Sequence, residues 1–162
     1  MKSILFTACT AVAAAASAFV GMPSLAHAGV LTTPGSACKV FGSSPSAAGL
    51  SAIGSTQAGT TNGDLQLSRS VICPVVRQGD QDGVTVYVDG QASEAAPVSC
   101  ILYSYNYDGT LKASKGFVEK RAQFDRSVSL SAAEAPLYAY LNVVCSLPGL
   151  HRAKIFGVLT SD

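Results

Sequence analysis

The tyrosines are the residues whose type and spacing first suggest a chemistry. Tyr103, Tyr105 and Tyr107 recur at every second position of one segment, and Tyr138 and Tyr140 do the same in a later one. Side chains two residues apart lie on the same face of a β-strand. In each segment this face is opposite to the one that holds cysteine or valine. The candidates for ligand contact are five tyrosines and one neighbouring amide: Tyr87, Tyr103, Tyr105, Tyr138, Tyr140 and Asn142.

Exposed aromatic rings beside amides and acids can stack on sugar rings or anchor a protein partner. The same pattern also fits aromatic pairing between neighbouring strands, or a second layer of core. If Cys100 is bonded to Cys145, the two tyrosine-bearing strands lie close together and their rings form one strip. Two interpretations therefore stay open: the tyrosines form a strip that binds a ligand, or they only stabilise the sheet.

An acidic segment resembles a calcium-binding loop in its spacing. Gln78 stands at the first position, Asp80, Asp82 and Gly83 at the third, fifth and sixth, and Asp89 at the twelfth. Gln at the first position and Asp at the twelfth weaken the ligand set, and a strand-like VTVYV follows where a helix is required. The sequence favours a hairpin turn with solvated acids over a weak calcium site at Asp80, Asp82 and Asp89.

Catalysis has little support in the sequence. There is no Gly-x-Ser-x-Gly element, His151 is the only histidine after residue 28, and tryptophan is absent. Paired carboxylates for glycoside cleavage remain open, because spacing along the chain does not report separation in space. We predict a non-catalytic protein without a cofactor. The alternative is a small secreted hydrolase or a protease inhibitor on the same scaffold.

The first 28 residues have the order of a secretory signal peptide. Lys2 is followed by an apolar, alanine-rich run over residues 4–20 and by the small-x-small site Ala26-His27-Ala28. No second long apolar run follows, so we expect no membrane span after processing and a secreted or periplasmic protein. Eleven basic residues against ten acidic ones leave no bulk basicity for nucleic-acid binding.

Four cysteines remain after the predicted signal peptide, an even number that favours two disulfides in an oxidising compartment. They are Cys38, Cys73, Cys100 and Cys145, and three connectivities are possible. We favour Cys38–Cys73 and Cys100–Cys145, because the last two each lie on the apolar face of a strand-like segment. The gaps between the cysteines are too long for the close pairs of a metal site.

The sequence of the rest of the chain predicts short strands separated by turns. A Gly/Ser/Ala/Thr-rich stretch over residues 42–63 gives way to segments in which apolar and polar residues alternate, the period of a strand. In the last segment we expect Ile155 and Leu159 on the face opposite to Val158. Turns are expected at Asp89-Gly90, Asp108-Gly109 and Pro148-Gly149.

These patterns predict an all-β fold, a two-sheet antiparallel sandwich of seven or eight strands with two disulfides. The predicted organisation is a signal peptide at 1–28, a Gly/Ser/Ala-rich arm at 29–66 tethered by Cys38, and a sandwich core at 67–162. Pro74 lies inside the first good strand, which indicates an edge position or a bulge.

Three elements, VICPVVR at 71–77, VSCILY at 98–103 and VVCSLP at 143–148, resemble those of small secreted bacterial proteins of unknown function. Such proteins share CPV-R, C-x-L and C-x-LP elements in this order. The resemblance implies a disulfide-stapled β-sandwich and transfers no catalytic residue. The expected function is that of an exported β-sandwich that binds a surface ligand, either glycan or protein, or that has a structural role in the cell envelope.

Overall fold

The computed structural model describes residues 31–42, 53–56, 59–65, 67–77 and 83–161. The predicted signal peptide lies outside these residues, as do Asp80 and Asp82. Of the helices within the described part, none is long and apolar enough to cross a membrane.

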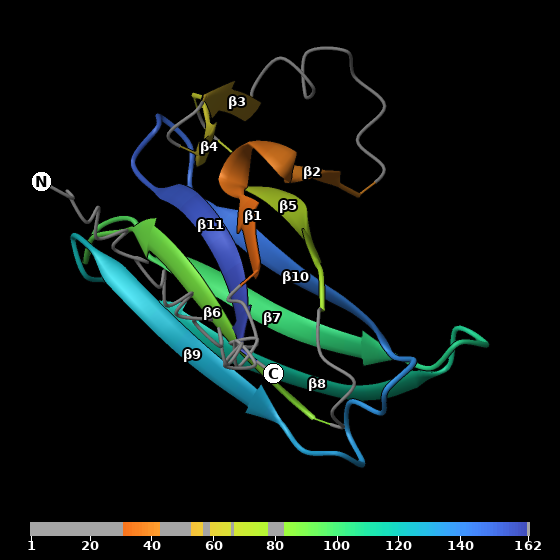
Figure 1. Ribbon diagram of the computed structural model, residues 1–162. Helices are drawn as coiled ribbons and strands as arrows, with labels where there is room; N and C mark the ends of the chain where they lie inside the picture. Colours follow the sequence, from red (N-terminus) through yellow and green to blue (C-terminus); the bar gives the residue numbers. More distant parts are fainter. Residues whose placement is uncertain (1–30, 43–52, 57–58, 66, 78–82, 162) are drawn as a thin grey trace, which may run out of the picture.

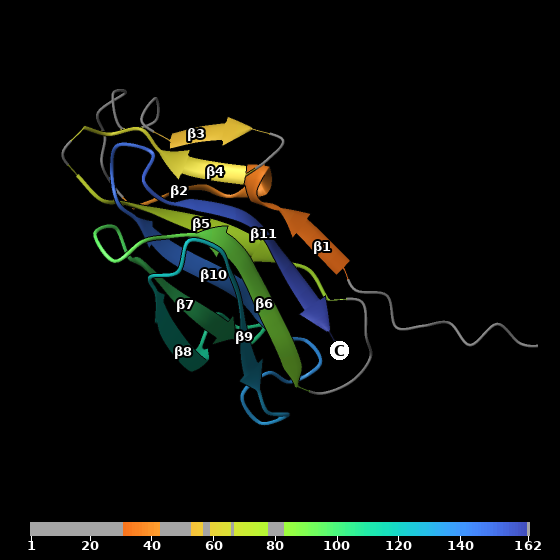
Figure 2. The ribbon, with the colours of Figure 1, turned by 90° about the vertical axis from the view of Figure 1, so that its left-hand side faces the viewer.

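Two antiparallel sheets face each other as two layers (Figures 1 and 2). Sheet A has the order β3-β4-β11-β6-β9, and β1 pairs with β11 beside β4. Its strands are β1 (Leu31–Pro34), β3 (Ile53–Thr56), β4 (Gly59–Asn62), β6 (Val84–Gln91), β9 (Phe124–Leu130) and β11 (Lys154–Ser161). Sheet B, in the order β2-β5-β10-β7-β8, has β2 (Lys39–Phe41), β5 (Arg69–Val75), β7 (Val98–Tyr105), β8 (Leu111–Glu119) and β10 (Tyr140–Leu147).

The predicted two-sheet antiparallel sandwich is confirmed. Seven of the described strands, β5 to β11, fall within the predicted core at 67–162. The four short strands β1 to β4 come from the predicted arm, together with the 3-10 helix η1 (Gly35–Ala37). They pair with both sheets, β1 and β4 with β11 and β2 with β5. These four described strands of the arm are therefore part of the two sheets, although their sequence lacks the alternating apolar residues of the core strands.

The core lies between the sheets and is formed by every second residue of the long strands. In β6 and β7 the buried positions alternate with partly exposed ones along the whole strand. Such alternation follows from the two-residue repeat of a strand that has one face on the core. The largest fully buried apolar side chains are Leu102, Leu147, Ile155, Val71, Val86, Val88, Val98, Val143 and Val158.

Both favoured disulfides are confirmed, and both involve sheet B. Cys38 is bonded to Cys73 and Cys100 to Cys145, with Cα atoms 4.1 and 4.0 Å apart. Cys100 and Cys145 are directly opposite each other on β7 and β10. The second bond therefore joins neighbouring strands of sheet B, whereas the first joins β5 to the residue just before β2. All four cysteines are buried in the core.

Pro74 occupies an open stretch of strand edge, as the sequence predicted. It pairs with Asn142 on β10, but the pairing of β2 with β5 ends at Ile72. Beyond that point no described strand pairs with β5 on this side. A residue without a backbone N–H is tolerated where a strand has no partner.

The turn expected at Asp89-Gly90 is wrong, and the turn after Pro148 is present but does not use its glycine for the positive φ angle. Gly90 lies inside β6, where a Cβ atom would come within 2.5 Å of the Phe124 ring. A glycine at this position admits close packing rather than a reversal. In the turn after β10, the positive φ angles belong to Leu150 and His151, at 63° and 54°, and not to Gly149. The turn at Gly109 is confirmed, with a φ of 81°.

The alternation expected in the last strand is also wrong. The register of β11 against β6 shifts between Ile155 and Gly157, so the strand contains a β-bulge. A bulge adds one residue to a strand and reverses the faces of the residues after it. Ile155 and Val158 are consequently both buried, whereas Leu159 is partly exposed.

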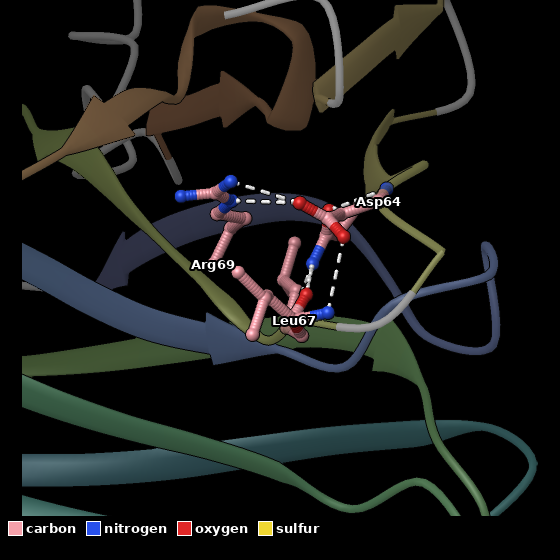
Figure 3. Close-up of polar contacts among 5 residues, drawn as sticks. Asp64, Leu67 and Arg69 are labelled. Atoms are coloured by element: carbon pink, nitrogen blue, oxygen red, sulfur yellow. Dashed lines mark hydrogen bonds and ion pairs between the residues drawn. The ribbon is translucent and has the colours of Figure 1, made fainter. Parts of the chain in front are cut away.

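A polar cluster connects the end of β4 with β5 and with the end of β10, and Figure 3 shows its contacts among Asp64, Leu67 and Arg69. The fully buried Asn62 donates to the carbonyl oxygens of Leu67 and Leu147 at 2.8 and 2.9 Å. Asp64 accepts from the backbone N–H of Leu67 at 3.0 Å and pairs with the Arg69 guanidinium at 2.8 Å. These bonds satisfy buried polar groups and fix the segment that leads from the predicted arm into the core.

The edge strands β8 and β9 are joined across the sheets by polar contacts. Lys115 on β8 donates to the carbonyl oxygen of Ser129 on β9 at 3.0 Å and to Glu134 at 2.8 Å. At the other end of β8, the buried Glu119 accepts two hydrogen bonds of 3.0 Å from Arg121. These hydrogen bonds, more than any other influence, lower the pKa of Glu119.

Candidate functional site

Four of the six predicted contact residues come together on the outer face of sheet B. Because β7 and β10 are neighbours, Tyr105 is directly opposite Tyr140, and Tyr103 is directly opposite Asn142. The rings of Tyr103 and Tyr105 stack, with centroids 6.1 Å apart and planes inclined by 25°. The two strands thus carry a continuous strip of three aromatic rings and one amide.

Tyr138 extends this strip into a pocket at one end of sheet B. The pocket has a volume of about 800 Å³. Its most exposed rings are those of Tyr107, Tyr138 and Tyr140, whose exposed fractions are 74%, 76% and 62%. The lining residues are Pro74, Val75, Arg77, Tyr107, Leu137, Tyr138, Ala139, Tyr140, Leu141 and Asn142. None of them is acidic.

Hydrogen bonds to backbone carbonyl oxygens hold the loop that carries Tyr138 in place. Arg77 donates hydrogen bonds to the carbonyl oxygens of Pro136 and Gly83, at 3.0 and 2.9 Å. The N–H of Ala139 donates to the same Pro136 oxygen at 2.8 Å, which closes a turn around Tyr138. Arg77 therefore acts as a positioning residue, and its charge lies in the wall of the pocket.

The sequence pattern placed Tyr107 on the same strand face as Tyr103 and Tyr105, but Tyr107 was not among the predicted contact residues. It lies instead in the turn between β7 and β8, where the N–H of Asn106 donates to the carbonyl oxygen of Thr110 at 2.8 Å. The Asp108-Gly109 pair was the available signal, since it marks a turn immediately after Tyr107. This turn brings the Tyr107 ring to the pocket.

Tyr87 lies apart from the other candidates, on the outer face of sheet A. It pairs with Leu159 on one side and Ser127 on the other. Two smaller hollows of about 470 and 270 Å³ lie on this face, and both are lined by Asp89 and Asp125. The alternation of the sequence shows that Tyr87 points outward, but it does not show from which sheet.

Asp89 and Asp125 are directly opposite each other on β6 and β9. Partial burial raises the pKa of Asp89 most, and repulsion from Asp125 and a hydrogen bond to it raise it further. The other two residues of the weak calcium candidate, Asp80 and Asp82, lie outside the described residues. Among the residues that are described, no three potential metal ligands gather at one point.

The sequence matches no known family and no curated protein. Among solved structures, the chain is similar to an exo-β-1,3-galactanase from Phanerochaete chrysosporium, at 12% identity and a TM-score of 0.44, over 83% of this chain but 30% of that one. It is also similar to the xylan-binding module CBM15, at 13% identity and a TM-score of 0.42, over 82% of this chain and 96% of that one. It is similar as well to TmCBM61 in complex with β-1,4-galactotriose, at 10% identity and a TM-score of 0.43, over 83% of this chain and 89% of that one. At these values no residue and no ligand is carried over to this chain.

Proposed function

We propose that this protein is an exported, non-catalytic β-sandwich that binds a glycan through the pocket at Tyr107, Tyr138 and Tyr140. The observation that carries the proposal is the gathering of these three exposed rings, from two loops and one strand, around a single hollow beside Asn142. The proposed ligand is a polysaccharide of the cell envelope or the extracellular space. The protein would meet it after secretion or in the periplasm.

The chemistry of the pocket suits a sugar. One face of a pyranose ring is apolar and stacks on aromatic rings, while its hydroxyl groups exchange hydrogen bonds with amide and phenol groups. Tyr138 and Tyr140 supply the rings, and Asn142 supplies an amide with both a donor and an acceptor. Large apolar side chains left in water cost free energy, so a ligand that covers them gains from their burial.

The non-catalytic part of the proposal is supported by where the carboxylates lie. General acid catalysis of glycoside cleavage requires carboxyl groups on either side of the bound sugar. Among the described residues that line the tyrosine pocket there is no carboxylate, and the opposed pair Asp89 and Asp125 lies on the other sheet. No cofactor is needed for binding of this kind.

Calorimetric titration with a defined panel tests the proposal. The panel contains hexasaccharides of β-1,4-linked glucose, xylose and galactose and of α-1,4-linked galacturonic acid. We expect the purified protein to bind at least one of them, and we expect a Tyr138→Ala, Tyr140→Ala double variant to lose that binding while its melting temperature stays within a few degrees. A protein that binds none at millimolar concentration, or a double variant that binds as well as the native chain, would overturn the proposal. A purely structural role predicts the first of these results.

A further inference from the structure

We infer that the binding site continues past the tyrosine pocket along the β5–β10 pair, and that it takes a segment of a linear polysaccharide rather than a single sugar or a chain end. This inference rests on the proposed function and defines the kind of glycan that the site accepts.

A second hollow on the same face carries the inference. Its volume is about 210 Å³, and Ala37, Lys39, Ile72, Pro74 and Asn142 line it. Pro74 and Asn142 also line the tyrosine pocket. The two hollows therefore meet at this pair of residues, which are directly opposite each other on β5 and β10.

The register of sheet B gives the direction of the combined site. Lys39 is paired with Ile72, which is paired in turn with Val144. From Val144 to Tyr140 is four residues along β10, or about 14 Å at 3.4 Å per residue. Lys39 lies two strands away from Val144, or about 10 Å at 4.8 Å per strand. The site thus runs obliquely across sheet B, from Lys39 at one end, past the Pro74–Asn142 pair, to the exposed tyrosines at the other.

An elongated site of this kind favours a chain over a single ring. One sugar that stacks on Tyr138 or Tyr140 leaves the second hollow empty, whereas its neighbours in a linear chain can reach Asn142 and then Lys39. The added contacts are intramolecular once the first sugar is bound, so they strengthen binding without a second loss of translational freedom. Lys39 is exposed and carries three donors for hydroxyl or carboxylate groups.

The far end of the site can be tested separately from the tyrosine end. Oligosaccharides of one to six units, from the same four series as the panel, are titrated into the native chain, a Lys39→Ala variant and a Lys112→Ala control. Lys112 is also an exposed lysine of an edge strand, but it lines neither hollow. We expect affinity to rise at least tenfold between the monosaccharide and the tetrasaccharide. We also expect Lys39→Ala to weaken only the longer ligands, about threefold to tenfold, and Lys112→Ala to change none.

The outcomes separate the two proposals. If the native chain binds no member of any series, the proposed function itself fails. If it binds but the monosaccharide is as tight as the hexasaccharide, or if Lys39→Ala matches the native chain at every length, glycan binding stands and the extended site is wrong. A Lys39→Arg variant, which keeps the charge and the donors, should restore most of the affinity for the long ligands.

Discussion

Sheet B and sheet A present two outer faces of opposite character. Both disulfides involve sheet B, and its outer face carries stacked tyrosines, an amide and a pocket of about 800 Å³ whose described lining residues include no acid. Sheet A has no disulfide among its described strands. Its outer face also offers an aromatic ring, Tyr87, but sets two carboxylates directly opposite each other beside it.

The contrast shows that outward tyrosines alone do not define a site. On sheet B, Tyr103, Tyr105 and Tyr140 lie on two strands that a disulfide joins. Their geometry is therefore constrained before any ligand arrives, and preorganisation lowers the entropic cost of binding. On sheet A the ring at Tyr87 lies next to two like charges, which oppose the pairing of their strands. The stapled sheet is therefore the better platform for recognition.

Removal of a sheet B disulfide should have the largest effect. Cys100→Ala with Cys145→Ala opens a loop of 45 residues, and chain entropy then predicts a loss of about 4 kcal/mol in the free energy of unfolding. Urea denaturation measures this loss. Amide exchange should quicken more in β7 and β10 than in β6 and β9. Equal acceleration in both sheets would remove the distinction between them.

Single ring deletions should distinguish the two faces by binding. Tyr140→Ala should lower the affinity for the hexasaccharide about tenfold. A loss of this size is typical when an aromatic contact at the centre of an interface is removed. Tyr87→Ala, a matched deletion on sheet A, should leave affinity within twofold. Calorimetry on both variants makes the comparison, and a greater loss for Tyr87→Ala would move the site to the other sheet.

Relief of the acidic pair should stabilise sheet A. Because the pKa of Asp89 is raised in the folded protein, folding takes up protons, and stability falls as pH rises from the usual value near 3.8 through the raised one. Asp125→Asn removes the repulsion and should stabilise the protein at pH 7 by about 0.2–1 kcal/mol.

Thermal melts at several pH values test this expectation. The gain from Asp125→Asn should shrink as pH falls through the raised pKa of Asp89, because the repulsion disappears once that carboxyl takes up a proton, and Asp89→Asn should give a similar gain at pH 7. A variant that is less stable than the native protein at pH 7 would show that the pair contributes a favourable contact.

The contact between Lys115 and Glu134 should give the smallest change in stability, and that change should be visible mainly at acidic pH. Hydrogen bonds from Lys115 and then Ser131 lower the pKa of Glu134 to about 2 from a usual value of 4.5. Its stabilising contribution is thus present above pH 4.5 and is lost as pH falls towards 2. In Glu134→Gln, the melting temperature should decline less steeply over this interval. An unchanged slope would show that the carboxylate has no role there.

The strands of the core could be predicted because their side chains alternate, and the register follows once the disulfides are known. Cys100 and Cys145 are directly opposite each other, so five steps along each strand bring Tyr105 opposite Tyr140. In the same way, one step from the Cys38–Cys73 bond brings Lys39 opposite Ile72. The aromatic strip was therefore within reach of the sequence.

Other features depend on contacts that no local pattern records. The bulge that buries both Ile155 and Val158 arises from the pairing of β11 with β6. The short strands of the arm form because β5 and β11 offer open edges, so their Gly- and Thr-rich sequence does not reveal them. The far hollow at Lys39 was missed for this reason.

Chemical-shift mapping of the ¹⁵N-labelled protein tests the central claim most directly. The probe is the tightest-binding hexasaccharide of the panel. The account predicts that the perturbed amides lie at Lys39, Ile72, Tyr107 and residues 138–142, and that those of β6 and β9 stay unchanged. Shifts centred on Asp89 and Asp125, or no shifts at millimolar hexasaccharide, would contradict it.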